Sequence, residues 1–186
     1  MNLILAMTGA TGAYAARLLL EKSPWPVTLV ASEWGQEIYR RECGPFEELA
    51  SLAKEVCDNH DLAAPASSGS VPNAGLVILP CSSNALAKVA AGLGDTLISR
   101  AAHCQLKERR PLVLCVREAP WGLIDLENAR RVAAAGAVVM PMSPPFYMFA
   151  KTDPKTVTMH DLLAAYIDRV LAVLGRPAAQ NWETAR

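Results

Sequence analysis

Residues 107–118 consist of a charged cluster, an apolar run and a final Arg-Glu pair. Cations and a carboxylate at the two ends of such a run are residue types that can bind an anion and transfer a proton. The segment opens with Lys-Glu-Arg-Arg and ends at Arg117-Glu118. An Arg and a Glu at the carboxyl end of a buried parallel strand stand where open α/β sheets bind ligands. We therefore interpret Lys107, Arg117 and Glu118 as an anion-binding and proton-handling group. The alternative for this segment alone is a helix end and a core strand followed by a surface ion pair.

A second candidate site is the turn Thr8-Gly9-Ala10-Thr11-Gly12-Ala13, which follows an apolar run and opens a helical pattern. Small residues in such a turn expose backbone N–H groups and hydroxyls, so the turn suits a phosphate. The spacing matches neither a dinucleotide fingerprint nor a Walker loop, and a plain strand-to-helix turn is the alternative. No acidic residue follows about 20 positions later to hold a dinucleotide ribose. A mononucleotide therefore fits better than NAD.

Hydroxyl side chains follow other apolar runs. Ser32 follows the second run, Ser82-Ser83 follows Pro80-Cys81, and a loop carries Ser67, Ser68 and Ser70. We expect these groups on the carboxyl side of the sheet, where they would form a pocket for a large neutral ring carrying a phosphate, and flavin mononucleotide (FMN) matches that description. Helix capping is the alternative for Ser82 or Ser83. Cys81 could be a nucleophile, but no histidine lies nearby in the sequence, so a buried thiol is favoured.

Strand-like and helical patterns alternate along the chain, which predicts a doubly wound parallel α/β sheet in one domain, residues 1–175, followed by a tail, residues 176–186. The expected strands are 3–7, 27–31, 76–79, 112–116 and 137–140. The expected helices are 13–22, 35–41, 83–91, 96–106, 126–135 and 159–174. Segments 63–72 and 141–147 are loops by composition.

Composition narrows the possible functions. Of the 186 residues, 52% are apolar, which predicts one buried core with apolar surface left for a homo-oligomer. The 18 basic residues balance the 18 acidic ones, so a general surface for nucleic acid or for an anionic membrane is not expected. The five cysteines lack metal-ligand spacing, so we expect reduced thiols and no metal. The absence of a signal-like or membrane-spanning run predicts a cytoplasmic protein.

Together these motifs resemble the UbiX-type flavin prenyltransferases, also labelled phenylacrylic acid decarboxylases. The resemblance runs in order from about residue 3 to residue 174, and its most specific part is 107–120. The segments that carry it are 8–12, 67–70, 80–82, Arg100-Ala101-Ala102, 107–114, Arg117-Glu118-Ala119-Pro120 and Phe146-Tyr147.

The resemblance implies a flavodoxin-like homo-oligomer, usually a dodecamer built from trimers, that binds FMN where subunits meet. It also implies a reaction without a metal ion. A dimethylallyl group moves from dimethylallyl monophosphate to N5 and then C6 of reduced FMN. The resulting prenylated FMN would serve a UbiD-type decarboxylase.

Residue roles implied by the resemblance fall into three sets. Glu42 and Glu118 stand where the family keeps carboxylates near the chemistry, with Glu118 as the base, and Lys107 and Arg117 join them as catalytic residues. The flavin contacts are Gly9, Ala10, Thr11, Ser32, Ser82, Ser83, Arg100 and Arg117. The contacts to the prenyl phosphate are Lys107, Arg117, Tyr147 and Arg169, with Trp182 near the prenyl group.

These residue types suit the reaction. A departing phosphate needs cations and donors, while restoring the aromatic ring at flavin C6 needs a base. Taken singly, Arg169 could pair with Asp168 or Asp161, and Tyr147 could be ordinary loop packing. Two other functions stay open. One is an FMN-dependent cysteine decarboxylase, whose motif and catalytic histidine have no match here, and the other is a non-catalytic flavin carrier or accessory subunit of a decarboxylase.

Overall fold

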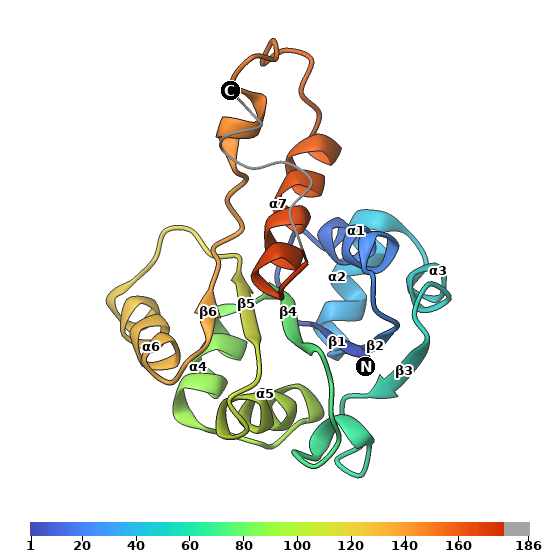
Figure 1. The fold of residues 1–186 in the computed structure, drawn as a ribbon, viewed down its shortest axis with the longest axis vertical. Helices are drawn as coiled ribbons and strands as arrows, with labels where there is room; N and C mark the ends of the chain where they lie inside the picture. Colours follow the sequence, from blue (N-terminus) through green and yellow to red (C-terminus); the bar gives the residue numbers. More distant parts are fainter. Residues whose placement is uncertain (177–186) are drawn as a thin grey trace.

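The computed structural model describes residues 1–176 and places six parallel strands in one sheet (Figure 1). The strand order is β3-β2-β1-β4-β5-β6, so the chain winds outward in both directions from the centre. The central strands are entirely buried, whereas β3 and β6 form the edges. The strands are β1 Leu3–Met7, β2 Val27–Ala31, β3 Glu55–Asp58, β4 Gly75–Cys81, β5 Leu112–Val116 and β6 Val138–Val139.

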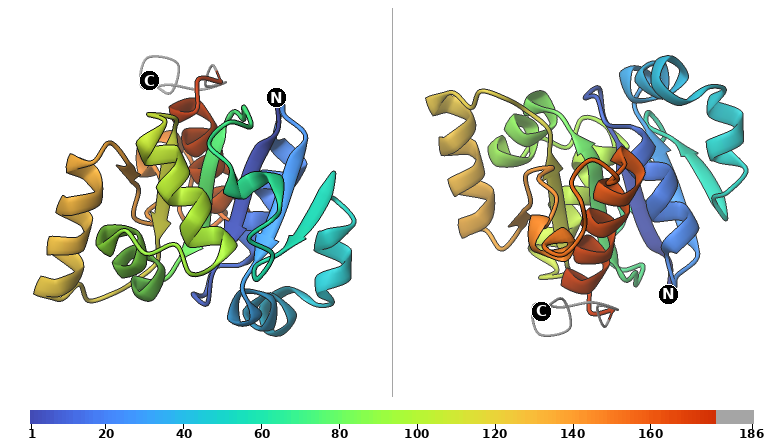
Figure 2. Two further views of the ribbon diagram at one scale, coloured as in Figure 1. Left: turned by 90° about the horizontal axis from the view of Figure 1, so that it is seen from below. Right: turned by 90° about the horizontal axis from the view of Figure 1, so that it is seen from above.

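Helices cover both faces of the sheet (Figure 2). One face carries α1 Tyr14–Lys22, α2 Glu33–Cys43, α3 Phe46–Ala50 and α7 Met159–Val173. The other face carries α4 Ser83–Ala91, α5 Leu97–Lys107 and α6 Leu123–Ala134. Two short 3-10 helices, η1 Pro65–Ser67 and η2 Phe146–Phe149, lie in the connections. The result is a three-layer α/β domain of the flavodoxin-like type.

Alternation along each strand explains the two cores. Leu3, Leu5 and Met7 of β1 belong to the core under α1 and α7, while Ile4 and Ala6 belong to the core under α4 and α5. Successive side chains of a strand point to opposite faces, so a strand covered on both sides reads as a continuous apolar run. None of the helices within residues 1–176 has both the length and the apolar character needed to cross a bilayer.

The structure confirms the expected strands and helices within a few residues and adds elements that the patterns did not predict. β3 reads Glu-Val-Cys-Asp and is mostly exposed, so it has no apolar run to reveal it. Its register with β2, Thr28 to Glu55 through Ala31 to Asp58, supplies the hydrogen bonds that make it a strand. The short helix α3 and both 3-10 helices were likewise not predicted.

Thr8 connects the carboxyl ends of β1 and β4, the two central strands, from which the chain continues toward opposite edges of the sheet. Its hydroxyl donates to the carbonyl oxygen of Pro80 at 2.9 Å and accepts from the N–H of Ser82, also at 2.9 Å. The side chain is buried, so these bonds are shielded from water. Thr8 therefore fixes the carboxyl end of β1 against the carboxyl end of β4, at the position where doubly wound sheets open a crevice.

We predict that Thr8→Val lowers the free energy of unfolding by about 1–3 kcal/mol, because the Ser82 N–H loses a buried acceptor. Urea denaturation measures the loss. The matched control is Thr28→Val, whose hydroxyl makes one long bond of 3.4 Å to the exposed Glu55. Equal losses for the two variants would contradict the role given to Thr8.

Candidate active site

A cavity of about 250 Å³ lies at the carboxyl edge of the sheet, beside the point where β1 and β4 diverge. The N-cap residues of three helices line it: Ser32 of α2, Ser82 of α4 and Thr96 of α5. Each hydroxyl accepts a backbone N–H of its own helix, so the capping alternative for Ser82 is confirmed. Three positive helix ends around one cavity favour an anionic group.

Gly9 lines the same cavity and has a steric reason to be glycine. A Cβ atom at this position would lie 2.7 Å from Cβ of Trp34, closer than non-bonded carbon atoms approach. The Trp34 side chain is 65% exposed and also lines the cavity, where it offers a flat apolar wall. Ala10 and Thr11 follow in the turn but do not line the cavity.

Several lining residues were not predicted from the sequence. Asn59 is buried, and its backbone and side-chain oxygens accept the N–H groups of Leu97 and Ile98 at 2.7 and 3.2 Å. A polar residue after a strand was a possible signal, but β3 itself was not predicted. The other unpredicted lining residues are Trp34, Ala85, Lys88, Val89, Thr96, Ile98 and Ser99.

Glu42 occupies the turn that the sequence assigned to a phosphate. Its carboxylate accepts the N–H of Gly12 at 2.9 Å and that of Ala13 at 2.8 Å. Gly12 has φ +92°, a left-handed conformation that suits glycine. The turn is therefore an anion site, as expected, but its anion is a carboxylate of the same chain.

Glu118 and Arg117 lie at the carboxyl end of β5, as predicted. The Glu118 carboxylate accepts the Ser83 hydroxyl at 3.0 Å and the N–H of Ala119 at 3.1 Å. Arg117 is exposed beside it, in an open groove of about 410 Å³ that Met142 also lines. A Cβ on Gly12 would touch Met142, so the groove adjoins the turn that holds Glu42. Two carboxylates and a cation thus gather near one edge of the cavity.

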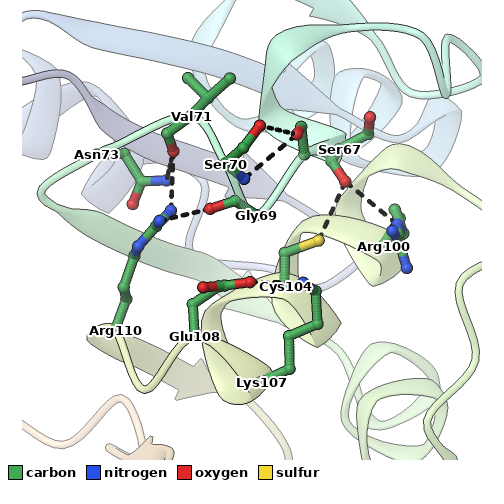
Figure 3. Close-up of polar contacts among 11 residues, drawn as sticks. Ser67, Gly69, Ser70, Val71, Asn73, Arg100, Cys104, Lys107, Glu108 and Arg110 are labelled. Atoms are coloured by element: carbon green, nitrogen blue, oxygen red, sulfur yellow. Dashed lines mark hydrogen bonds and ion pairs between the residues drawn. The ribbon is translucent and has the colours of Figure 1, made fainter.

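Lys107 does not join this group within one subunit, contrary to expectation. It ends α5, at the start of β5, whereas Arg117 follows the end of that strand. Five strand residues span roughly 16 Å. At this opposite edge Lys107 pairs with Glu108 at 2.5 Å (Figure 3).

Residues 67–73, here called the Gly69 loop, were also misplaced. We expected the serines of this loop on the carboxyl side, but the loop leads into β4 and packs against Lys107 and Glu108 (Figure 3). Arg100, predicted as a flavin contact, does not line the cavity and donates to the backbone carbonyl of Ser67 at 3.2 Å. The flavin-binding roles of Ala10, Thr11 and Arg100, like those of the other predicted flavin contacts, stay predictions.

The remaining predicted residues lie on the α7 side. Arg169 is exposed, and neither candidate partner holds it. Asp168 pairs with Lys22, and the Asp161 carboxylate accepts the N–H and hydroxyl of Thr158, the N-cap residue of α7. Tyr147 is half-buried in η2, and Trp182 lies outside the described residues. Cys81 is fully buried, and burial raises the pKa of its thiol far above the ordinary value, which confirms the structural interpretation.

The comparisons with known proteins identify the family of this chain. The family model described as Flavoprotein matches residues 1–171. A flavin prenyltransferase UbiX of Deinococcus radiodurans is 41% identical over 187 residues, covering 97% of this chain and 93% of the relative. The chain belongs to the UbiX-type flavin prenyltransferases.

Two solved structures of the family superpose closely. AnUbiX (PadA1), crystallised with FMN and dimethylallyl pyrophosphate, gives a TM-score of 0.89 at 36% identity and covers 97% of this chain and 96% of its own. A dodecameric FMN-dependent Ubix-like decarboxylase from Escherichia coli O157:H7 gives 0.88 at 35% identity, with 97% and 98% covered. The UbiX-like resemblance and the fold are thereby confirmed.

We predict that Glu42→Ala lowers the free energy of unfolding by about 1–2 kcal/mol, because two N–H groups at the start of α1 lose their acceptor and the helix end loses a favourable charge. Chemical denaturation checks this value. Glu37→Ala, which removes an exposed pair with Arg41 on the same helix, is the control and should cost less. A loss for Glu42→Ala no greater than the control would contradict the role of the carboxylate.

Proposed function

We propose that this chain transfers a dimethylallyl group from dimethylallyl monophosphate to N5 and C6 of reduced FMN, and that a UbiD-type decarboxylase receives the prenylated flavin. The observation that carries the proposal is the pairing of two features at one sheet edge. A cavity surrounded by three helix N-termini adjoins a groove that holds Arg117 and Glu118. AnUbiX (PadA1), crystallised with FMN and dimethylallyl pyrophosphate, supports FMN and a phosphorylated dimethylallyl donor as the two ligands.

FMN fits the cavity chemically. Gly9, Ser32 and Ser82 offer backbone and hydroxyl groups to a neutral ring system, and Trp34 offers an apolar wall. Lys88 is a lining cation that already pairs with Asp95 at 2.6 Å, so the charge at the edge comes chiefly from the helix ends. FMN is the flavin that this site would hold, and in its reduced form it supplies the nucleophilic N5.

The groove suits the departure of phosphate and the loss of a proton. The bond between the allylic carbon and the phosphate oxygen breaks as that carbon bonds to flavin N5, which would lose its proton. Phosphate leaves with the electron pair, and Arg117 stabilises its charge. For ring closure the alkene would take up a proton as the bond to C6 forms, and Glu118, which Ser83 and Ala119 hold by hydrogen bonds, would accept the proton that C6 loses. Glu42, fixed at the nearby turn, adds a second negative charge that favours an allylic cation.

A second copy of the chain completes the site. The cavity of about 250 Å³ is below the roughly 300–1,000 Å³ of pockets that enclose a whole ligand. We propose that Lys107 of a neighbouring copy binds the phosphate in the Arg117 groove, together with Tyr147 and Arg169. Exposed apolar residues such as Leu123, Ile124 and Phe146 support subunit contacts, and the dodecameric relative supports an assembly of that size.

The decisive experiment incubates the purified protein anaerobically with reduced FMN and dimethylallyl monophosphate and analyses the extracted flavin by mass spectrometry. The proposal predicts a gain of one C5 unit. A parallel reaction with the pyrophosphate identifies the donor. Recovery of unmodified FMN bound to folded protein with both donors would overturn the proposal and favour a flavin carrier or a cysteine decarboxylase.

We predict that Glu118→Gln abolishes ring closure while FMN stays bound, because the amide keeps the shape of the side chain but cannot accept the proton. Mass spectrometry measures the added C5 unit, and absorption spectra of the bound flavin separate the open from the closed product. Glu127→Gln, an exposed charge removal on α6, is the matched control. An unimpaired Glu118→Gln enzyme would refute the base assignment.

A further inference from the structure

The Lys107–Glu108 pair lies under a loop that is held in place from two sides (Figure 3). The Arg110 guanidinium donates to the carbonyl oxygens of Gly69 at 2.5 Å and Val71 at 2.8 Å. The Ser67 carbonyl at the other end accepts from α5, where Arg100 Nε lies at 3.2 Å and Cys104 Sγ at 3.0 Å. Through its backbone carbonyl groups the Gly69 loop is therefore fixed both to α5 and to Arg110, which follows that helix.

Within the loop, Gly69 leaves room for both charged groups. A Cβ atom there would lie within 3.0 Å of the Glu108 carboxylate and of the Lys107 ammonium. The hydrogen bond from Lys107 also lowers the pKa of the Glu108 carboxyl below its ordinary value. Both side chains are still partly exposed, at 45% for Lys107 and 35% for Glu108. The ammonium is held but remains accessible.

We propose that Gly69 and Glu108 are positioning residues that hold the Lys107 ammonium where it binds the phosphate of the prenyl donor. This inference rests on the proposed function, in which Lys107 serves the site of a neighbouring copy. A lysine has a flexible four-carbon stem, and fixing its charge beforehand removes an entropic cost from phosphate binding. The Ser-Ser-Gly-Ser segment would thereby act by positioning Lys107 rather than by contacting the flavin.

The first test measures steady-state prenylation of reduced FMN by Gly69→Ala and Glu108→Gln. Each variant is expected to raise KM for dimethylallyl monophosphate about tenfold, as loss of alignment in a charge-assisted bond predicts, with kcat within about twofold. Glu108→Asp, which keeps a carboxylate, should recover most of the lost affinity. Unchanged KM in both variants, or a fall in kcat alone, would overturn the proposal.

Two control variants match these changes. Gly94→Ala adds a methyl group whose nearest neighbour would be an ordinary 3.6 Å away, and Glu127→Gln removes an exposed carboxylate on α6. Both should keep the KM of the unaltered enzyme. A similar rise in KM for either control would mean that the effect does not belong to the Lys107–Glu108 pair.

A second readout does not depend on prenylation. The rate of Lys107 acylation by an N-hydroxysuccinimide ester, followed by peptide mass spectrometry, should rise several-fold in Gly69→Ala, because the ammonium no longer has to leave its carboxylate first. An unchanged rate would overturn the positioning role even if the unaltered enzyme were active. Faster acylation in a protein that prenylates no flavin would refute the proposed function and its phosphate role, while leaving the pairing itself established.

Discussion

The divergence of β1 and β4 is the constraint on which the site depends. Connections leave these neighbouring strands toward opposite edges of the sheet, so no loop crosses between them and a cavity remains. Thr8 closes the base of that opening by bonding to Pro80 and Ser82. The helices that start around it bring their N-termini to one place, and the preference for an anionic ligand follows from the topology rather than from a cluster of basic side chains.

The interior of the fold could be predicted from sequence because its strands are buried on both faces. Runs such as Leu3–Met7 and Leu112–Val116 are apolar throughout, and a covered parallel strand requires that composition. β3 could not be predicted because only its pairing with β2 makes it a strand. Asn59 lies just after β3, and because β3 was not predicted, the contact of Asn59 with the start of α5 could not be predicted either.

The site was only partly predictable, since sequence adjacency does not say which edge of the sheet a residue reaches. Ser32 and Ser82 were placed correctly because each directly follows a buried strand. Lys107 was expected beside Arg117, but a full strand separates the two within one subunit. The Gly69 loop descends to the opposite edge before β4, and its serine composition carries no information about that path. The sequence pattern identified which charged residues could take part in chemistry, whereas the fold was needed to show which of them lie together.

The Glu42 carboxylate competes with any phosphate ligand for the N–H groups of the turn after β1. This carboxylate already bonds to the N–H groups of Gly12 and Ala13, and it is tethered to them through the same folded chain. A tethered group acts at an effective concentration on the order of millimolar or above, without any loss of translational freedom. A phosphate that approached this turn from solution would have to displace it. The turn is therefore closed to the pyrophosphate of a dinucleotide by an anion that is always present.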